Sequence, residues 1–278
     1  MSRGLPRQQP NRPGLVFLDR ILELRRQLPV PSAEQLARWQ EEALAAPPTR
    51  GFARALRSGP RPRIIAEFKR ASPSKGLLSA ALDPAVQARA YQDGGAVAMS
   101  VLTEEAYFQG SAADLRAARA ACSLPVIRKD FLLHDWEIPQ SRCWGADAVL
   151  LIAAALPTAR LARMLDLCRE YGLDALVEVH TSEEALQVAP LRPALVGINN
   201  RDLVSFRVEL EVTRRLLPLL PDESVKVSES CFENSEQLAL FPEVDAFLIG
   251  ETLVRTEEPQ VCLRRLRGDS SNWSGNEV

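Results

Sequence analysis

The sequence is poor in metal-binding residues and has no closely spaced cysteines. Its 278 residues include only two histidines, His134 and His180, and neither has a second histidine at ligand spacing, so we expect no metal site. The five cysteines are widely spaced and contain no Cys-x-x-Cys pair, which argues against zinc binding and redox chemistry. We expect them to be reduced thiols of a cytoplasmic protein: Cys122, Cys143, Cys168, Cys231 and Cys262.

Long apolar runs and an excess of basic charge are also missing. No stretch approaches the roughly 18 apolar residues of a membrane helix, and the N-terminus lacks the apolar segment of a secretion signal. We therefore expect a soluble, cytoplasmic protein that does not bind a membrane. The 34 Lys and Arg against 36 Asp and Glu give a formal net charge of -2, which argues against nucleic acid as a partner. An anionic substrate must then be attracted by a local field in a cleft.

The chain does alternate between short β-type runs and longer amphipathic segments, with helical patterns such as 84–93, 112–121 and 158–171. The β-type runs are apolar on both faces, as in a parallel sheet covered by helices. An α/β fold, a closed (β/α)8 TIM barrel, is therefore the leading interpretation. An open doubly wound sheet is the main alternative, but no Gly-x-Gly-x-x-Gly follows any run. The predicted strands lie near 63–68, 97–102, 125–128, 147–152, 175–178, 195–198, 224–228 and 245–249.

A helical extension precedes the predicted barrel. Residues 1–14 are rich in Pro, Arg, Gln and Gly, a composition typical of disorder. Ile21 and Leu22 then belong to a run with helical spacing, and a second helix is predicted from Ser32, an N-cap candidate with Gln35 at its third position. We predict three parts: an extension with helices over 1–60, a catalytic barrel over 61–267, and a polar, disordered tail over 268–278.

Polar side chains end most of the predicted strands. In the first of them an apolar run gives way to Glu67 and Lys69, which are two residues apart and so lie on one face of a strand. Burying a carboxylate beside an ammonium costs free energy unless the two are paired or needed for chemistry. Because the active site of a barrel lies at the carboxyl ends of its strands, we expect a group of such residues to meet there: Glu67, Lys69, Lys129, Glu178, Asn199, Arg201, Glu229 and Ser230.

Several of these side chains suit acid–base chemistry on an anionic substrate. Lys129 should point inward with a charge that nearby carboxylates help retain, which suits a general acid toward a carbonyl oxygen, and Glu178 is a candidate base. Asn199 and Arg201 offer fixed donors for an anionic or polar substrate. At the seventh and eighth strands, Ser230 and Gly250 fit a phosphate cradle built from backbone N–H groups.

Six motifs follow one another along the predicted strands: Glu67-Phe68-Lys69-Arg70-x-Ser72-Pro73-Ser74-x-Gly76, Ser100-Val101-Leu102-Thr103-Glu104 with Phe108-x-Gly110-Ser111, Arg128-Lys129-Asp130-Phe131, Val177-Glu178-Val179-His180, Gly197-Ile198-Asn199-Asn200-Arg201-Asp202-Leu203 and Ser228-Glu229-Ser230. In this order they resemble the indole-3-glycerol phosphate synthase family of the tryptophan pathway. The resemblance covers roughly residues 15–265. It extends to the N-terminal helices, which in that family help to cover the substrate.

This resemblance implies a lyase of aromatic amino-acid biosynthesis that acts as a decarboxylase without a cofactor. Its reaction closes 1-(2-carboxyphenylamino)-1-deoxyribulose 5-phosphate to indole-3-glycerol phosphate, with loss of carbon dioxide and water. Lys129 would protonate the substrate carbonyl while the aromatic carbon attacks, and Glu178 would serve as base. Lys69 would hold the substrate and is a candidate acid for the dehydration, and Glu67 would position the lysines and the anilino nitrogen. Which lysine acts in which step stays open.

The same resemblance implies the remaining contacts to the substrate. The substrate-contacting positions are Asn199, Arg201, Ser230, Ser72, Phe108, Phe131, Pro73, Leu150 and Leu203. The phosphate would meet Ser72, Ser230, Cys231, Gly250 and the backbone of Glu251. The implied partner is thus a small phosphorylated substrate of a monomer or weak homodimer, and contact with other tryptophan-pathway enzymes stays open.

One position departs from the family pattern, because Cys231 stands where the family usually has glycine. If the loop takes a positive φ there, a β-carbon must point away from the phosphate or push it outward. In the alternative, the residue has an ordinary negative φ and packs as a small hydrophobe. Two other functions also stay open: another phosphate-binding barrel enzyme, such as phosphoribosylanthranilate isomerase, and a non-catalytic barrel that acts as a binding partner.

Overall fold

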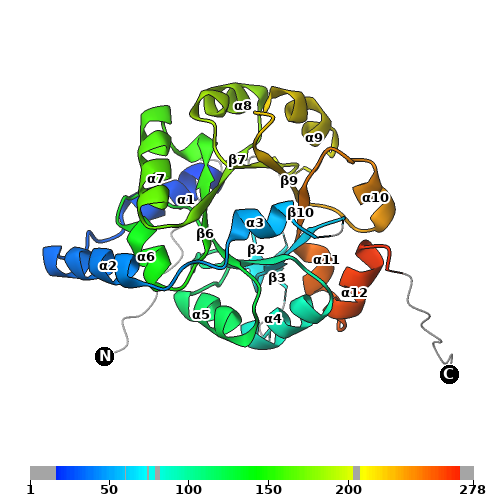
Figure 1. Ribbon diagram of the computed structural model, residues 1–278, viewed down its shortest axis with the longest axis horizontal. Coiled ribbons are helices and arrows are strands. Elements are labelled where there is room, and N and C mark those ends of the chain that lie inside the picture. The colour runs from blue at the N-terminus through cyan, green and yellow to red at the C-terminus, as the bar shows by residue number, and fades with distance from the viewer. Residues whose placement is uncertain (1–16, 60, 74, 79–81, 203–206, 270–278) are drawn as a thin grey trace.

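The protein is a closed barrel of eight parallel strands surrounded by helices (Figure 1). The computed structural model describes residues 17–59, 61–73, 75–78, 82–202 and 207–269. The expected disorder over 1–14 and in most of the 268–278 tail therefore lies outside the described residues. Around the barrel the strand order is β1-β10-β9-β8-β7-β6-β5-β4, and β4 pairs with β1 to close it. The strands are β1 (Ile64–Phe68), β4 (Ala98–Leu102), β5 (Val126–Lys129), β6 (Ala148–Ile152), β7 (Asp174–Val179), β8 (Leu195–Asn199), β9 (Val225–Glu229) and β10 (Ala246–Ile249).

These strands form where the sequence is apolar on both faces. All five residues of β1, β4 and β6 are buried, because helices cover the outside while side chains fill the inside. Each strand lies within one residue of its predicted range at either end. The predicted (β/α)8 barrel is confirmed, and the open doubly wound sheet is wrong because the eight strands form a closed ring in which none is an edge strand.

Side-chain caps at several helix starts explain where those helices begin. Asp83 accepts hydrogen bonds from the backbone of the first turn of α4, and Ser111 does the same for α5. Ser32 caps α2 through the backbone N–H of Gln35, as the sequence predicts. The helices are α1 (Phe17–Arg26), α2 (Ala33–Ala45), α3 (Phe52–Arg57), α4 (Pro84–Asp93), α5 (Ala112–Ala121), α6 (Glu137–Cys143), α7 (Thr158–Glu170), α8 (Ser182–Val188), α9 (Glu211–Leu216), α10 (Ser235–Ala239), α11 (Glu251–Val254) and α12 (Pro259–Leu266), with short 3₁₀ helices η1 (Ala153–Ala155), η2 (Ala189–Leu191) and η3 (Leu217–Leu219).

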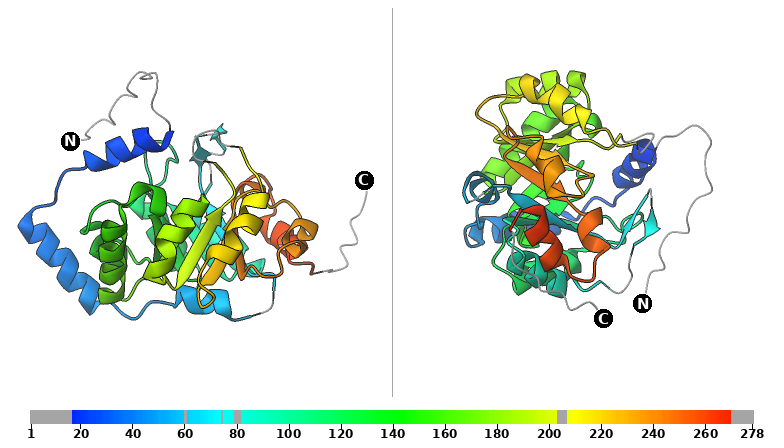
Figure 2. Two further views of the ribbon diagram at one scale, coloured as in Figure 1. Left: turned by 90° about the horizontal axis from the view of Figure 1, so that it is seen from above. Right: turned by 90° about the vertical axis from the view of Figure 1, so that its right-hand side faces the viewer.

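Of the helices that precede the barrel, α1 and α3 lie at its two ends, while α2 packs along its side against α6 (Figure 2). Helix α3 covers the amino ends of the strands, where Asp174 accepts a hydrogen bond from the backbone of Ala53 at 2.8 Å. Helix α1 lies at the opposite end, together with the short hairpin of β2 (Ala71–Ser72) and β3 (Gly76–Leu77) (Figure 2). The sequence analysis did not predict this hairpin. Catalytic groups at the carboxyl ends of the strands therefore face α1 and the hairpin.

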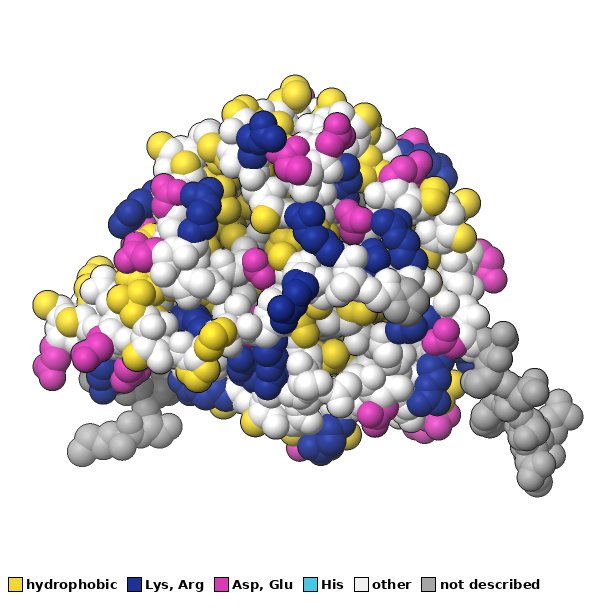
Figure 3. All heavy atoms as spheres, viewed as in Figure 1, with side chains coloured by type: hydrophobic (Ala, Val, Ile, Leu, Met, Phe, Trp, Pro, Cys, Tyr) yellow, Lys and Arg dark blue, Asp and Glu magenta, His cyan; other side chains and the backbone are white. Residues whose placement is uncertain are grey.

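Charges of both signs are scattered over the face of the molecule that α3 covers (Figure 3). Lys and Arg side chains alternate there with Asp and Glu, without a continuous basic stripe. Among the described residues, no helix is long and apolar enough to cross a membrane.

Candidate active site

Lys129 lies between two buried carboxylates at the carboxyl end of the barrel. Its Nζ is 2.9 Å from Glu178 Oε2 and 2.9 Å from Glu229 Oε2. Lys129 and Glu229 are the last residues of β5 and β9, and Glu178 is the last but one of β7. Closure of the barrel thus brings together groups that are 49 and 100 residues apart in sequence. The lysine side chain is only 13% exposed. Burial opposes its charge, but the two glutamates outweigh burial and hold the pKa of Lys129 above its usual value.

The two glutamates differ in how readily they hold a proton. Burial alone would raise the pKa of Glu178, but Lys129 and His180 outweigh it, so this pKa lies well below its usual value. Burial raises the pKa of Glu229 to about 7, against the attraction of Lys129 and with the help of the Glu178 charge. The Oε1 atom of Glu229 is buried and has no hydrogen-bond partner among the described residues. Of the two carboxylates, Glu229 therefore takes up a proton more readily, and Glu178 stays ionised.

His180 supports the ionised state of Glu178 from behind. Its Nε2 is 3.2 Å from Glu178 Oε1, and its Nδ1 is 3.3 Å from Glu184 Oε2 on α8. Burial lowers the pKa of the ring, but the two carboxylates raise it to about 10. The contact with Glu178 thus gives this histidine a supporting position in the site.

Two glycines make room for the acidic side chains. A β-carbon at Gly197, in the middle of β8, would lie 2.1 Å from Glu229 Oε1, and one at Gly250 would lie 2.4 Å from Glu67 Oε1. Glu67, the last residue but one of β1, and Lys69, just after the strand, form an ion pair in this space. A larger residue at either position would displace the carboxylate end of Glu229 or of Glu67. The predicted phosphate residue Gly250 therefore also accommodates the Glu67–Lys69 pair.

A second polar group lies after β8 and β9. Asn199 Oδ1 accepts hydrogen bonds from the Ser230 hydroxyl at 2.9 Å and from the backbone of Arg201 at 3.0 Å. The Arg201 guanidinium donates to Cys231 Sγ at 3.5 Å and lies 3.5 Å from Glu251 Oε2. The structure thus brings together five of the residues proposed for substrate and phosphate.

The backbone after β9 adopts a conformation that favours glycine. Ser230 has a φ of +77° and Cys231 a φ of +64°. The alternative in which Cys231 has an ordinary negative φ is therefore wrong. A β-carbon in this left-handed region costs on the order of 1 kcal/mol or more, so the departure from the family pattern falls where glycine would fit best.

Aromatic rings form the opposite side of the site. Phe108 and Phe131, from the loops after β4 and β5, have ring centroids 6.3 Å apart. The Glu104 carboxylate fixes the first loop by accepting the backbone N–H of Phe108 at 3.1 Å, along with those of the two preceding residues. Phe17 of α1 contacts Phe131 edge-on, with 6.4 Å between centroids. The two predicted ring contacts are therefore neighbours beneath α1.

The other predicted contacts lie further from these groups. Ser72 and Pro73 lie on or beside the β2–β3 hairpin, which the backbone of Ala71 joins to Phe108 through a 3.3 Å hydrogen bond. Leu150 is buried in β6, two residues before Ile152, the register partner of Glu178. The predicted contact at residue 203 lies outside the described residues. The carboxylate of Glu251 pairs with Arg255 at 2.9 Å, so only its backbone is available for a phosphate.

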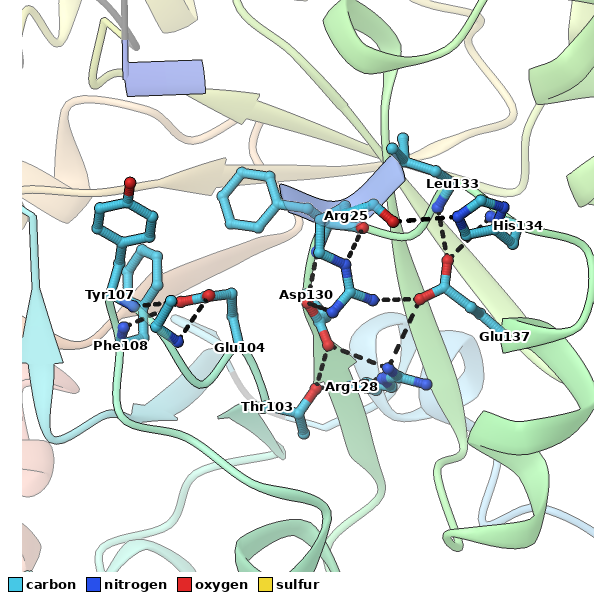
Figure 4. Close-up of polar contacts among 12 residues, drawn as sticks. Arg25, Thr103, Glu104, Tyr107, Phe108, Arg128, Asp130, Leu133, His134 and Glu137 are labelled. Atoms are coloured by element: carbon cyan, nitrogen blue, oxygen red, sulfur yellow. Dashed lines mark hydrogen bonds and ion pairs between the residues drawn. The ribbon is translucent and has the colours of Figure 1, made fainter. Parts of the chain in front are cut away.

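The sequence analysis missed Arg25, a residue of the N-terminal extension that reaches the active-site end of the barrel. Its guanidinium pairs with Glu137 and donates a 3.0 Å hydrogen bond to the carbonyl oxygen of Phe131 (Figure 4). An arginine in the last turn of an amphipathic helix usually has a solvated side chain near the helix dipole. The sequence pattern alone therefore gave no signal for this contact.

A closed barrel with two lysines and three glutamates at the carboxyl ends of its strands defines an acid–base enzyme of the (β/α)8 class. The family model described as indole-3-glycerol phosphate synthase matches residues 18–266. The chain belongs to the indole-3-glycerol phosphate synthase family, whose enzymes are carboxy-lyases.

Individual relatives agree with this family. The protein named indole-3-glycerol phosphate synthase from Dechloromonas aromatica (strain RCB) is 44% identical to this chain over 239 residues. The match covers 84% of this chain and 91% of the relative. The one from Azospirillum brasilense is 43% identical, covering 84% of this chain and 92% of the relative. The one from Bordetella pertussis is 46% identical, covering 81% of this chain and 88% of the relative. An isomerase and a non-catalytic binding barrel are not favoured.

Solved structures of other barrels show the same fold at low sequence identity. KGPDC from Streptococcus mutans superposes with a TM-score of 0.58 at 12% identity and covers 75% of this chain and 96% of its own. A thiamine phosphate pyrophosphorylase from Pyrococcus furiosus superposes with a TM-score of 0.54 at 16% identity, over 74% of this chain and 93% of its own.

Proposed function

We propose that Lys129 is the acid of the ring-closing step by which this chain makes indole-3-glycerol phosphate. The observation that supports this is its position between Glu178 and Glu229, at 2.9 Å from each. As the aromatic carbon that bears the carboxylate attacks the carbonyl carbon, a carbon–carbon bond forms and the carbonyl oxygen takes a proton. An ammonium held in a cavity by carboxylates is placed to give that proton. Loss of carbon dioxide then restores the aromatic ring.

Glu178 is the proposed base of the steps that follow. After decarboxylation the new hydroxyl leaves as water, and a proton must leave the neighbouring carbon to complete the indole. Glu178 stays ionised beside His180 and Lys129, which keeps it able to accept that proton. Lys69, paired with Glu67, is the proposed acid for the departing hydroxyl and lies next to Gly250.

The phosphate is proposed to bind after β8, β9 and β10. Arg201 and Ser230 lie there on either side of Asn199, and the consecutive positive φ angles of Ser230 and Cys231 turn the chain sharply at this point. Successive N–H groups in such turns favour anions. Ser72, Gly250 and the backbone of Glu251 complete the proposed set. The substrate ring would then lie toward the other side, among Pro73, Phe108, Phe131 and Leu150.

We further propose that the chain acts in the cytoplasm as a monomer or weak homodimer. All five cysteines are free in the structure, which fits a reducing compartment. All the proposed catalytic and substrate-binding residues lie on one chain, so the proposed reaction does not require contact with other tryptophan-pathway enzymes.

Turnover by the purified protein tests the proposed function directly. Incubation with 1-(2-carboxyphenylamino)-1-deoxyribulose 5-phosphate should produce the fluorescence of indole-3-glycerol phosphate and one equivalent of carbon dioxide. Phosphoribosylanthranilate is the control substrate and should stay unchanged. Conversion of the control without indole formation would support the isomerase instead.

A further inference from the structure

Helix α1 is joined to the active-site end of the barrel through one arginine in its last turn. Arg25 Nε donates to the Phe131 carbonyl oxygen at 3.0 Å, its Nη2 pairs with Glu137, and its Nη1 is 3.4 Å from Asp130 Oδ1 (Figure 4). The backbone carbonyl oxygen of Arg25 also lies 3.1 Å from His134 Nε2. With its side chain 12% exposed, Arg25 is largely enclosed by the loop between β5 and α6.

The two carboxylates that Arg25 meets also hold the backbone of that loop. Asp130 Oδ1 accepts the N–H of Phe131 at 2.8 Å, and Glu137 Oε2 accepts the N–H groups of Leu133 and His134 at 2.7 and 2.9 Å. The loop therefore depends on two buried negative charges, and Arg25 contacts both of them.

A second arginine, from β5, completes the charge balance. Arg128 donates to Asp130 at 3.0 Å and lies 3.9 Å from Glu137. Two arginines thus face two carboxylates. Without the Arg25 side chain, Glu137 would lose its close ion pair, and α1 would keep only the backbone contact of Arg25 to His134 as a polar link to the loop.

The loop carries an aromatic ring of the site. Phe131 follows Lys129 by two residues and lies next to Phe108, and its own carbonyl oxygen accepts the Arg25 hydrogen bond. The other end of α1 supplies Phe17, which contacts both Phe131 and Tyr107, with centroids 6.4 and 5.1 Å apart. Helix α1 therefore spans both aromatic loops, held by an aromatic contact at one end and an ion pair at the other.

We propose that Arg25 is a positioning residue that couples the docking of α1 to the place of Phe131, and so to the binding of the aromatic ring of the substrate. This rests on the proposed function, in which Phe108 and Phe131 contact that ring. Arg25 touches neither the Lys129 carboxylate pairs nor the proposed phosphate residues. Its loss should weaken binding of ligands that carry the ring and spare ligands that carry only the phosphate.

The test compares two probes with variants of the full chain. One probe is the substrate with its carbonyl reduced to an alcohol, which cannot cyclise, and the other is ribulose 5-phosphate, which has no ring. Arg25→Met should raise the Kd of the reduced substrate by about tenfold, since misplacement of a binding group by a fraction of an ångström has effects of this order. The Kd of ribulose 5-phosphate should stay unchanged. Arg25→Lys keeps the charge without the planar fork and should show an intermediate loss.

Two further variants separate positioning from general destabilisation. Arg26→Met is the matched control, because Arg26 is the exposed neighbour on the same helix and its loss should change neither Kd. The double variant Arg25→Met with Glu137→Gln restores the charge balance while Gln can still accept the loop N–H groups. It should regain thermal stability and still bind the reduced substrate weakly.

Three results would overturn the proposal: equal weakening of both probes, no weakening of either, or recovery of reduced-substrate binding in the double variant. The last would mean that Arg25 acts through charge balance alone. Because these measurements need no turnover, they stand apart from the test of the proposed function. Indole formation by the wild type without the expected Kd pattern would reject only the role of Arg25.

Discussion

Strand β5 carries two buried ion clusters on its opposite faces, and they are built differently. The outer cluster consists of Arg128, Asp130, Arg25 and Glu137, and the inner cluster consists of Lys129, Glu178, Glu229 and His180. Arg128 and Lys129 are consecutive, so the alternation of the strand sends one toward the helices and the other into the barrel. A single strand thus serves both clusters.

The outer cluster leaves no carboxylate oxygen without a partner. Asp130 Oδ2 accepts from Thr103 at 2.7 Å and from Arg128, while Oδ1 accepts from the backbone and lies near Arg25. In the inner cluster, by contrast, Glu229 Oε1 is buried without a partner among the described residues. The outer cluster, in which every carboxylate oxygen has a partner, holds a loop in place. We infer that the inner cluster, in which Glu229 Oε1 has none among the described residues, can accept a proton from the substrate.

Removal of Arg128 from the outer cluster should destabilise the fold more than any other substitution considered below. Arg128→Met should lower the free energy of unfolding by about 3–5 kcal/mol, because it leaves a buried carboxylate without its main partner. Denaturant unfolding at constant pH measures this. Arg169→Met, at an exposed ion pair, is the control and should cost less than about 1 kcal/mol. If both substitutions had equal small effects, the outer cluster would not hold the fold.

Loss of the inner lysine should affect turnover instead. Lys129→Ala removes the proposed acid and should lower kcat by at least about 10²-fold, while ribulose 5-phosphate still binds. Its effect on unfolding should be smaller than that of Arg128→Met, because Glu229 can take up a proton when its partner is gone. Steady-state kinetics and calorimetric binding decide the point. Turnover retained within a few-fold would remove Lys129 from the proposed step.

The pH dependence of stability should reflect the inner cluster, since His180 titrates there. Its folded pKa of about 10 lies above the ordinary 6.5, so its contribution to stability is complete below about pH 6.5 and disappears as the pH rises through 10. The wild type should therefore lose up to about 1.4 kcal/mol per pH unit over this window. In His180→Gln the side chain still lies beside Glu178 and Glu184 but does not titrate, while Glu178 keeps its ion pair with Lys129. The stability of this variant should therefore depend less on pH over the same window.

Urea unfolding at several pH values between 7.5 and 9.5 measures this slope. The raised pKa of Glu229, about 7, gives a loss of stability as the pH rises from 4.5 to 7, below the chosen window. Arg26→Met serves as a control that should keep the wild-type slope. Equal slopes in the wild type and His180→Gln would show that the ring is not held as an imidazolium.

Much of the barrel and of the inner cluster could be predicted from sequence, for a physical reason. Apolar runs that end in polar residues mark the carboxyl ends of strands, and barrel closure must bring these ends together. Lys129, Glu178 and Glu229 are therefore all expected near one another. The direct pairing of Lys129 with Glu229 and the raised pKa of Glu229 depend on the curvature of the barrel and on the space left by Gly197, which the sequence does not express.

The outer cluster could not be predicted in the same way. Arg25 and Phe131 are 106 residues apart, and their contact depends on how α1 docks, which no local pattern encodes. The two faces of β5 thus differ in predictability as well as in chemistry. The left-handed backbone at Cys231 also stayed undecided, because a cysteine gives no sign of its φ angle.

The smallest predicted effect concerns that cysteine, which lies on the phosphate side of the inner cluster. In Cys231→Gly the residue can keep its φ of +64° without a β-carbon, and Arg201 loses a 3.5 Å contact to the thiol that competes with an anion. KM should fall by about two- to fivefold, which corresponds to roughly 1 kcal/mol or less. The phosphate is remote from the bonds that change, so kcat should stay constant.

The companion variant Cys231→Ala separates the two causes of this gain. Alanine removes the thiol from Arg201 but keeps the β-carbon in the left-handed region, so it should recover only the part of the gain that comes from loss of the thiol contact. A lower KM in the glycine variant alone would assign the effect to the backbone, because only glycine relieves the strain at positive φ. Steady-state measurements of both variants against the wild type decide this, and an unchanged or raised KM in Cys231→Gly would mean that the cysteine does not weaken phosphate binding.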